Sequence, residues 1–165
     1  MQPVQALDAG WSDRSARDEY GSGARLGCFK RGEAAAAFPH AIHVGLPALR
    51  AARGRGVPED CARLDALMAI MSRLDDTCLL HRGGLAALET AKAGARAVLV
   101  AGGAEAPAGM DRLHRLHAEL MALWASPGGS ADLLGVTLFL DRLERGSWYV
   151  SSQEESCHGN TDLRV

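Results

Sequence analysis

The chain has 165 residues, of which 47% are hydrophobic and 23% are charged, and its formal net charge is -2. These values are typical of a globular protein of one domain, and the weak negative charge excludes the basic field on which nucleic-acid binding depends. No apolar run reaches the ~20 residues of a membrane-spanning helix, and the first residues lack the basic-then-apolar order of a signal peptide. We therefore expect a cytoplasmic protein with no nucleic-acid or membrane partner.

The N-terminal part predicts short elements. Residues 1–32 are rich in Gly, Ser, Asp and Arg, which favours an irregular lead-in with one short helix near residues 12–20. The alanine run at 34–37 is expected to open a helical stretch. Pro39 and Pro47 are tolerated in the first turns of helices, so they predict two further short helices.

A long helix is predicted from residue 58 to about residue 81. The sequence Pro-Glu-Asp at 58–60 favours a helix start, because proline needs no N–H in the first turn and carboxylates are stabilised at the positive end of the helix dipole. Apolar residues then repeat every three or four positions between 64 and 78, which defines one face toward a core. Gly83 and Gly84 are expected to stop this helix.

The same periodicity predicts three more helices, over residues 85–100, 110–124 and 131–144. No segment alternates strongly enough to compete as a strand. The expected fold class is therefore all-α, a single bundle of about five to seven helices over residues 1–145 that could be part of a larger helical domain. Residues 146–165 turn polar and lose the period, so they are expected to form a disordered tail.

The first polar cluster is LDDTCLLHRGG at 74–84, expected at the C-terminal end of the long helix. At about 100° per residue, Asp75 and Arg82 both lie near the apolar face, where an unpaired carboxylate is costly. One interpretation is an internal Asp75–Arg82 pair. In the other, Asp75 and Asp76 bind Mg²⁺ or remove a proton, while His81 and Arg82 contact anionic oxygen atoms.

The second polar cluster is SPGGSAD at 126–132. Ser126 followed by Pro127 fits an N-cap and a first-turn residue, and the glycines leave backbone N–H groups exposed at a positive helix end. Such a turn can hold a phosphate, although an ordinary turn between antiparallel helices explains the pattern as well. No lysine follows the glycines and no strand precedes them, so this is neither a P-loop nor a dinucleotide fingerprint. The pattern indicates a helical protein that binds a phosphorylated ligand.

The cysteines and histidines suggest no metal site. The four cysteines have no CxxC spacing and are expected to be reduced thiols. The pairs His40/His43 and His114/His117 could each place two ligands on one helix face. Because no acidic or cysteine partner lies nearby in the sequence, ordinary surface histidines are the favoured interpretation.

The two clusters, in this order and separated by two helices, closely resemble the triphosphoribosyl-dephospho-coenzyme A synthase family. The flanking sequence is similar too, in GAR at 23–25, AFP at 37–39, GLPALR at 45–50 and LFL at 138–140. The resemblance covers roughly residues 12–145. The version that serves malonate decarboxylase is nearer than the citrate lyase version, chiefly through CLLHRGG at 78–84 and the alanine-rich helices.

The resemblance implies an enzyme with ATP and 3′-dephospho-coenzyme A as substrates. The 2′-hydroxyl of dephospho-coenzyme A attacks C1′ of the ATP ribose, adenine leaves, and the product is the prosthetic-group precursor of an acyl carrier subunit. The carry-over gives Asp75 and Asp76 catalytic or Mg²⁺-binding roles. It gives substrate- or phosphate-binding roles to Thr77, His81, Arg82, Gly83, Gly84, Ser126, Gly128, Gly129, Ser130 and Asp132, the last toward ribose or metal.

Two departures from the family stand out. Trp124 and Ala125 occupy positions where the family usually has an asparagine followed by an apolar residue. The family is also longer at its N-terminus, where a GVNTH-type motif has no match here. The chain therefore resembles the C-terminal portion of the family, and a separate N-terminal half or a second copy of the chain is the expected protein partner. The alternatives are a non-catalytic helical module that binds a nucleotide or a carrier protein, and a helical scaffold.

Overall fold

The computed structural model describes residues 28–146, and every regular element in that range is a helix. In chain order these are α2 (Cys28–Ala35), the π-helix η1 (Ala41–Gly45), α3 (Leu46–Gly54), α4 (Glu59–Met71), α5 (Thr77–Val100), α6 (Pro107–Ala122) and α7 (Gly128–Glu144). The all-α prediction is confirmed. None of these helices is long and apolar enough to cross a membrane. The helix predicted near 12–20 and the predicted tail beyond Gly146 lie outside the described residues.

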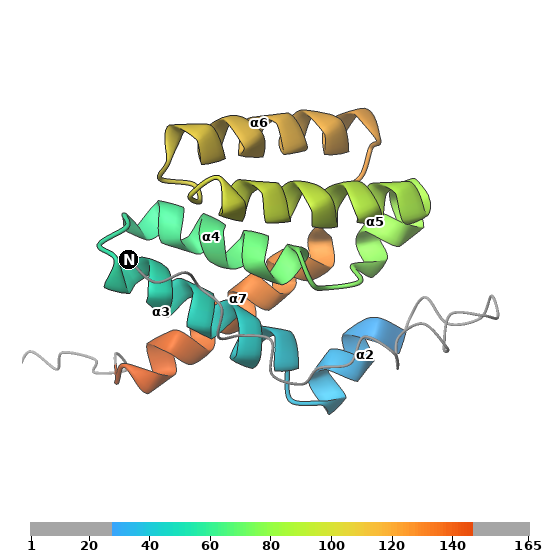
Figure 1. The fold of residues 1–165 in the computed structure, drawn as a ribbon. Helices are drawn as coiled ribbons and strands as arrows, with labels where there is room; N and C mark the ends of the chain where they lie inside the picture. The colour runs from blue at the N-terminus through green and yellow to red at the C-terminus, as the bar shows by residue number, and fades with distance from the viewer. Residues whose placement is uncertain (1–27, 147–165) are drawn as a thin grey trace, which may run out of the picture.

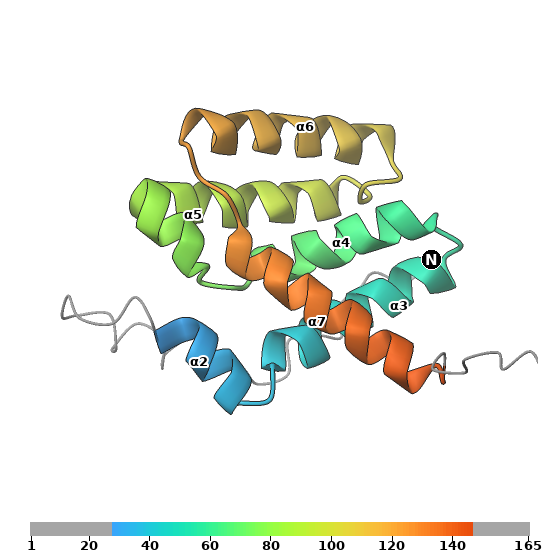
Figure 2. The same ribbon diagram turned by 180° about the vertical axis from the view of Figure 1, so that it is seen from behind.

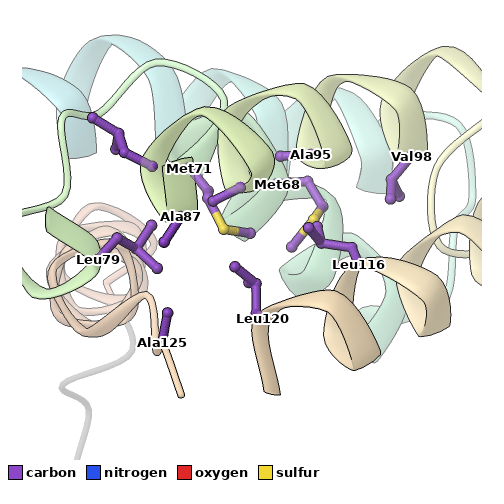
Figure 3. Packing of buried hydrophobic residues seen from close by; sticks show 11 residues of the cluster. Met68, Met71, Leu79, Ala87, Ala95, Val98, Leu116, Leu120 and Ala125 are labelled. Atoms are coloured by element: carbon purple, nitrogen blue, oxygen red, sulfur yellow. The ribbon is translucent and has the colours of Figure 1, made fainter. Parts of the chain in front are cut away.

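The helices α4, α5 and α6 stack in successive layers, and α7 runs across α3 and α4 on one side of the stack (Figures 1 and 2). The main core lies between the stacked helices (Figure 3). Within α5, the fully buried alanines recur every fourth residue and form one face of small side chains. This face lets α6 approach closely, and a Cβ added at Gly94 would lie 2.5 Å from Cδ1 of Leu116. The row is Ala87, Ala91 and Ala95.

The long helix predicted over 58–81 is wrong, because α4 ends at Met71 and α5 begins at Thr77. Asp76 is the N-cap of α5, with extended backbone angles and a side chain that accepts a hydrogen bond from the Cys78 N–H at 2.9 Å. The apolar period continues through the break because Leu74 and Leu79 both remain fully buried. Periodicity alone therefore could not reveal the turn.

The alanine run at 34–37 ends α2 instead of opening a helix, which corrects a second prediction. The Phe38 N–H bonds to the Glu33 carbonyl at 2.7 Å, and the Ala37 N–H bonds to the Ala34 carbonyl at 3.1 Å. This is a Schellman ending, in which the residue after the cap is normally glycine because its φ is positive. Here Ala37 and Phe38 have φ values of 59 and 57. Pro39 follows, as is common after a helix end.

The pair Gly83-Gly84 bends α5 instead of stopping it. Gly84 has φ 66 and ψ -164, a combination that is essentially restricted to glycine. At Gly83 an added Cβ would lie 2.4 Å from Cβ of Ala87 and 3.3 Å from Cβ of Ala125, so this position has no room for a side chain. The predicted helix over 85–100 is confirmed as the part of α5 beyond the bend, which both ribbon views show (Figures 1 and 2).

The last two helices are confirmed with shifted boundaries. The helix predicted over 110–124 is α6, which begins three residues earlier at Pro107. The helix predicted over 131–144 is α7, which begins at Gly128 because the two glycines form its first turn. Both clusters singled out in the sequence therefore sit at helix N-termini, 74–84 at the start of α5 and 126–132 at the start of α7.

Candidate functional site

Asp76 joins the two polar clusters. Its carboxylate is fully buried, with 0% of the residue exposed. Oδ1 accepts hydrogen bonds from the N–H of Cys78 at 2.9 Å and of Gly129 at 3.2 Å. Oδ2 accepts from the N–H of Ser130 at 2.7 Å and from the Ser130 hydroxyl at 2.9 Å. One side chain therefore caps both α5 and α7, and it brings the two clusters together in space.

This arrangement explains how a carboxylate can be buried without a basic partner. A carboxylate offers about four lone-pair sites, and the four donors use all of them. The positive ends of two helix dipoles also converge on the charge. Asp76 is thus a positioning residue that fixes the N-termini of α5 and α7 against each other.

The turn predicted to hold a phosphate holds the Asp76 carboxylate. The N–H groups of Gly129 and Ser130 bond to Asp76, that of Gly128 bonds to the Ser126 carbonyl at 2.9 Å, and that of Ala131 bonds to the Pro127 carbonyl at 3.0 Å. The first turn of α7 is therefore fully engaged within the protein.

The glycines of this turn permit close contact. A Cβ on Gly129 would lie 2.9 Å from Oδ1 of Asp76, and a Cβ on Gly128 would lie 2.9 Å from Sγ of Cys78. The prediction that Ser126 caps α7 is wrong, because Ser126 is exposed, Pro127 occupies the N-cap position and makes no side-chain cap bond, and Asp76 supplies the acceptor instead. Small residues at 128 and 129 let the α4–α5 turn approach the start of α7.

The predicted Asp75–Arg82 pair is wrong. Oδ1 of Asp75 lies 2.5 Å from Nζ of Lys92, and both side chains are largely covered. Arg82 is exposed. The prediction assumed one straight helix, whereas Asp75 lies in the turn before α5 and so meets a residue four turns further along α5, beyond the bend.

The described residues do not fit a protein-bound Mg²⁺ at Asp75 and Asp76. Asp76 has no acceptor site left, and Asp75 is neutralised by Lys92. Between residues 32 and 146, where side chains are described, no group of three or more His, Cys, Asp or Glu side chains could hold a metal ion.

A cavity of about 200 Å³ lies beside the Asp76 junction, between α2, the α4–α5 turn and α7. Each polar cluster contributes to its wall, and so does α2. The lining residues are Glu33, Phe38, Leu74, Thr77, Gly129, Asp132, Leu133 and Val136. Of the predicted site residues, Thr77, Gly129 and Asp132 are therefore brought together here.

His81 and Arg82 lie outside the cavity wall and are exposed on the first turns of α5. His81 follows Thr77 by four residues, so the two side chains share one face of the helix, about one turn apart. Gly83 and Gly84 follow directly and make the bend. His81 and Arg82 are thus presented to solvent about one helix turn beyond Thr77, which lines the cavity.

The sequence interpretation missed the pair of Glu33 and His40. Glu33 is buried, with 8% exposed, and its Oε1 lies 2.5 Å from Nδ1 of His40. The His40 backbone N–H makes a longer bond of 3.4 Å to Oε2. The favoured interpretation of His40 as an ordinary surface histidine is wrong, because its side chain is only 18% exposed and has an acidic partner. The Schellman turn between the two residues hides their proximity from any helical spacing.

A second, partly buried ion cluster ties α3 to α4 and α7, and none of its residues lines the cavity. Arg53 forms a two-pronged contact with Glu59, at 2.7 Å for both bonds, and a third bond of 2.7 Å to the buried Asp141. The hydrogen bond from Arg53 lowers the pKa of Glu59 to about 2, and the bond to Glu59 raises the pKa of Arg53 further. This cluster stabilises the scaffold that carries α7.

Comparisons with known proteins identify relatives over the part of the chain that contains both polar clusters. The family model for ATP:dephospho-CoA triphosphoribosyl transferase matches residues 30–151. A protein of Azotobacter vinelandii named probable 2-(5''-triphosphoribosyl)-3'-dephosphocoenzyme-A synthase is 59% identical over 114 residues, which are 69% of this chain and 39% of that protein. A protein of Pseudomonas aeruginosa with the same name is 50% identical over 148 residues, 88% of this chain and 48% of that protein.

A protein of Klebsiella pneumoniae, named 2-(5''-triphosphoribosyl)-3'-dephosphocoenzyme-A synthase, is 54% identical over 113 residues, 68% of this chain and 40% of that protein. The chain thus spans less than half the length of these curated relatives. No solved structure matches it. The match of the family model over most of the chain, together with these identities, shows that the chain belongs to the ATP:dephospho-CoA triphosphoribosyl transferase family.

Proposed function

We propose that this chain forms part of the site at which the triphosphoribosyl group of ATP is transferred to 3′-dephospho-coenzyme A. In this reaction the 2′-hydroxyl oxygen of dephospho-coenzyme A forms a bond to C1′ of the ATP ribose. The bond from C1′ to adenine breaks, and adenine leaves with the proton that the hydroxyl gives up. The observation that carries the proposal is the junction at Asp76, which joins both family-like clusters beside one cavity.

The buried carboxylate of Asp76 positions the residues that face the cavity. Thr77 follows Asp76 directly, and Asp132 lies one half-turn beyond Ser130, which Asp76 holds through two hydrogen bonds. Thr77 and Asp132 are therefore assigned to substrate contact. Asp75 is assigned a supporting role through Lys92, because its ion pair fastens the α4–α5 turn to the part of α5 beyond the bend.

His81 and Arg82 are assigned to the phosphates of the substrates. They are exposed cationic or hydrogen-donating side chains, four and five residues beyond Thr77 in the cavity wall. Such groups bind phosphate oxygen atoms through short, charge-assisted hydrogen bonds. Gly84 bends the helix immediately after them. The bend leaves the short segment from 77 to 83 as a separate platform for these two side chains.

The product is proposed to serve the acyl carrier subunit of malonate decarboxylase. This assignment is supported by the likeness of CLLHRGG at 78–84 and of the alanine-rich helices to that version of the family. Transfer of the prosthetic group to purified carrier subunits of malonate decarboxylase and of citrate lyase, in parallel, tests it. A product accepted only by the citrate lyase subunit contradicts it.

The experiment that tests the reaction is adenine release, measured by chromatography with ATP, dephospho-coenzyme A and Mg²⁺. The chain is assayed alone and together with the separately expressed segment of the Klebsiella pneumoniae relative that it does not match. Catalytic groups that act as a unit fail together, so we expect background release from the chain alone and turnover from the combination.

Two controls make the assay specific. Omission of dephospho-coenzyme A should abolish adenine release, and an exposed substitution on α6, Asp111→Asn, should leave the combined activity unchanged. Adenine release without dephospho-coenzyme A, or no release from the combination while the full-length relative is active, refutes the proposal. Turnover by the chain alone shows that residues 1–165 hold a complete site.

A second function, a non-catalytic module that binds a nucleotide, is supported by the engagement of both Asp75 and Asp76 with partners inside the protein. It predicts thermal stabilisation by ATP or dephospho-coenzyme A without adenine release in any combination. A helical scaffold predicts neither effect. Thermal melting with each nucleotide, run beside the adenine assay, separates the three functions.

A further inference from the structure

The wall of the cavity has the wrong chemistry for a triphosphate. None of its eight residues is Lys, Arg or His, and two of them, Glu33 and Asp132, are acidic. Phosphate oxygen atoms placed there would lie beside two carboxylates, with no basic side chain among these eight residues. The other side chains are apolar, apart from the hydroxyl of Thr77 and the backbone at Gly129. Such a wall suits a ligand that donates hydrogen bonds at one side and is flat and apolar at the other.

The size of the cavity points the same way. It measures about 200 Å³, below the roughly 300–1,000 Å³ of sites that enclose a whole small molecule. It therefore holds one part of a larger ligand. A sugar and part of a base, with the phosphates outside, agree with this size and with the exposure of His81 and Arg82, which follow the lining residue Thr77 by four and five residues.

Glu33 is the buried acid with acceptor capacity to spare. Both oxygens of Asp76 are saturated by four donors at 2.7 to 3.2 Å. Among residues 32–146, whose side chains are described, Glu33 has two partners, both on His40, at 2.5 and 3.4 Å. About two of its four lone-pair sites therefore remain for a ligand. Asp76 and Glu33 are both buried, but Glu33 alone of the two lies in the cavity wall and has unused acceptor sites.

Phe38 gives the cavity a fixed apolar wall. It packs against the buried cluster of Ile70, Leu74 and Leu133, and it does so with a left-handed backbone. A bulky residue adopts that conformation only when its surroundings hold it there. The Glu33–His40 pair closes the same turn, so the acid and the ring are held as one unit.

We propose that this cavity is a ribonucleoside subsite in which Glu33 accepts hydrogen bonds from the ribose hydroxyls. Leu133, Val136 and Phe38 flank the sugar and base, and the phosphates leave the cavity toward His81 and Arg82. The inference deepens the proposed function and rests on it, because ATP and dephospho-coenzyme A both carry an adenosine with free 2′- and 3′-hydroxyls.

The test uses the 165-residue chain and three probes: adenosine, 2′,3′-dideoxyadenosine and inorganic tripolyphosphate. Binding is followed by the methyl NMR signals of Leu74, Leu133 and Val136, which line the cavity. Adenosine should shift these signals saturably and bind roughly tenfold or more tightly than the dideoxy compound, because hydrogen bonds to a charged group are lost with the hydroxyls. Tripolyphosphate should leave these methyl signals unchanged.

Two variants localise the effect. Glu33→Gln should weaken adenosine roughly tenfold and leave dideoxyadenosine unchanged, whereas the exposed control Glu89→Gln should change neither. Val136→Phe fills the cavity and should abolish binding of both nucleosides. A thermal melt of each variant shows whether it is folded.

Four results overturn the inference: no saturable shift with adenosine, equal affinity for the two nucleosides, displacement of adenosine from the cavity by tripolyphosphate, or equal weakening of both nucleosides by Glu33→Gln. These outcomes are distinct from failure of the proposed function. If the combined segments release adenine but the chain binds adenosine and dideoxyadenosine equally, the proposed reaction is supported and the ribonucleoside subsite is refuted. If adenosine binding depends on Glu33 but no combination releases adenine, the subsite is supported and the proposed reaction is refuted.

Discussion

Replacement of Asp76 tests the central feature of the structure, the carboxylate shared by two helix N-termini. In Asp76→Asn the side chain keeps its shape, but one oxygen becomes an NH₂ group. In one orientation this group faces the N–H groups of Cys78 and Gly129, and in the other it faces the N–H of Ser130. Either way a donor points at a backbone donor within a fully buried site.

The expected loss of stability follows from the donors that are left without an acceptor. Each buried unsatisfied group costs about 1–3 kcal/mol, and loss of an N-cap costs about 1 kcal/mol per helix. Because the Ser130 hydroxyl can rotate and accept, not every bond is lost. The sum is about 3–5 kcal/mol for Asp76→Asn, close to the cost of breaking a buried ion pair.

The assay is urea unfolding followed by the helical circular dichroism signal. Asp111→Asn on the exposed face of α6 is the matched control and should lie within about 0.5 kcal/mol of the wild type. The slope of the unfolding free energy against urea should stay the same for both variants. If Asp76→Asn unfolds within about 1 kcal/mol of the wild type, Asp76 is not the shared cap described above, and the argument for its positioning role fails.

Three further predictions concern the backbone and the second ion cluster. Trp124 has φ 51 and is 86% exposed, so Trp124→Gly should stabilise the chain by about 1 kcal/mol in urea unfolding; a loss of stability contradicts the strain. Gly84→Ala should destabilise by roughly 1–3 kcal/mol, because φ 66 with ψ -164 excludes a Cβ, and an unchanged unfolding midpoint contradicts this. The pKa of Glu59 is lowered from 4.5 to about 2, so its ion pair with Arg53 stabilises the fold fully above pH 4.5 and is lost as the pH falls toward 2. The side chain is 40% exposed, which reduces the effect; Glu59→Gln should flatten the decline of the melting temperature over this pH range, and an unaltered decline argues against the pair.

The sequence predicted the helices well wherever the apolar period stopped at the residue where the helix ends. The segments beyond residue 85 show this, because glycine or proline marks their boundaries. It failed between 58 and 84 because Leu74 and Leu79 both face the core from different elements, so the apolar period runs through the turn. The Asp-Asp-Thr sequence at 75–77 carries a helix-start signal that the periodicity concealed.

The candidate site could be predicted only in part. The family resemblance assigned substrate-binding residues to both clusters, and the hydrogen bonds of Asp76 show that the two clusters lie together. The sequence could not show that the anion at the start of α7 is the Asp76 carboxylate. The Ser130 N–H donor and the Asp76 acceptor are 54 residues apart in the sequence. The same limit applies to Asp75 and Lys92, which meet only because Gly84 bends the helix between them.

The positive φ at Trp124 gives a backbone reason for the asparagine that the family resemblance leads one to expect at this position. The Trp124 and Ala125 N–H groups bond to the carbonyls of Met121 and Leu120, at 3.0 Å in each case, so α6 has a Schellman ending with Trp124 at the left-handed position. Asparagine tolerates this conformation better than any bulky residue. An asparagine at this position would therefore suit the left-handed backbone even if its side chain made no polar contact.

The bond between Asp76 and Ser130 closes a long loop that contains α5 and α6. Within this loop α6 packs chiefly on α5 and forms the outermost layer (Figure 1). The outer layer can therefore open without parting the ends of the loop. In native-state hydrogen exchange, the amides of α6 should exchange through such a partial opening, while the buried Ser130 amide should exchange only when the whole chain unfolds. The helix α6 behaves in this respect as an appendage on a smaller cooperative unit, and that unit carries the cavity.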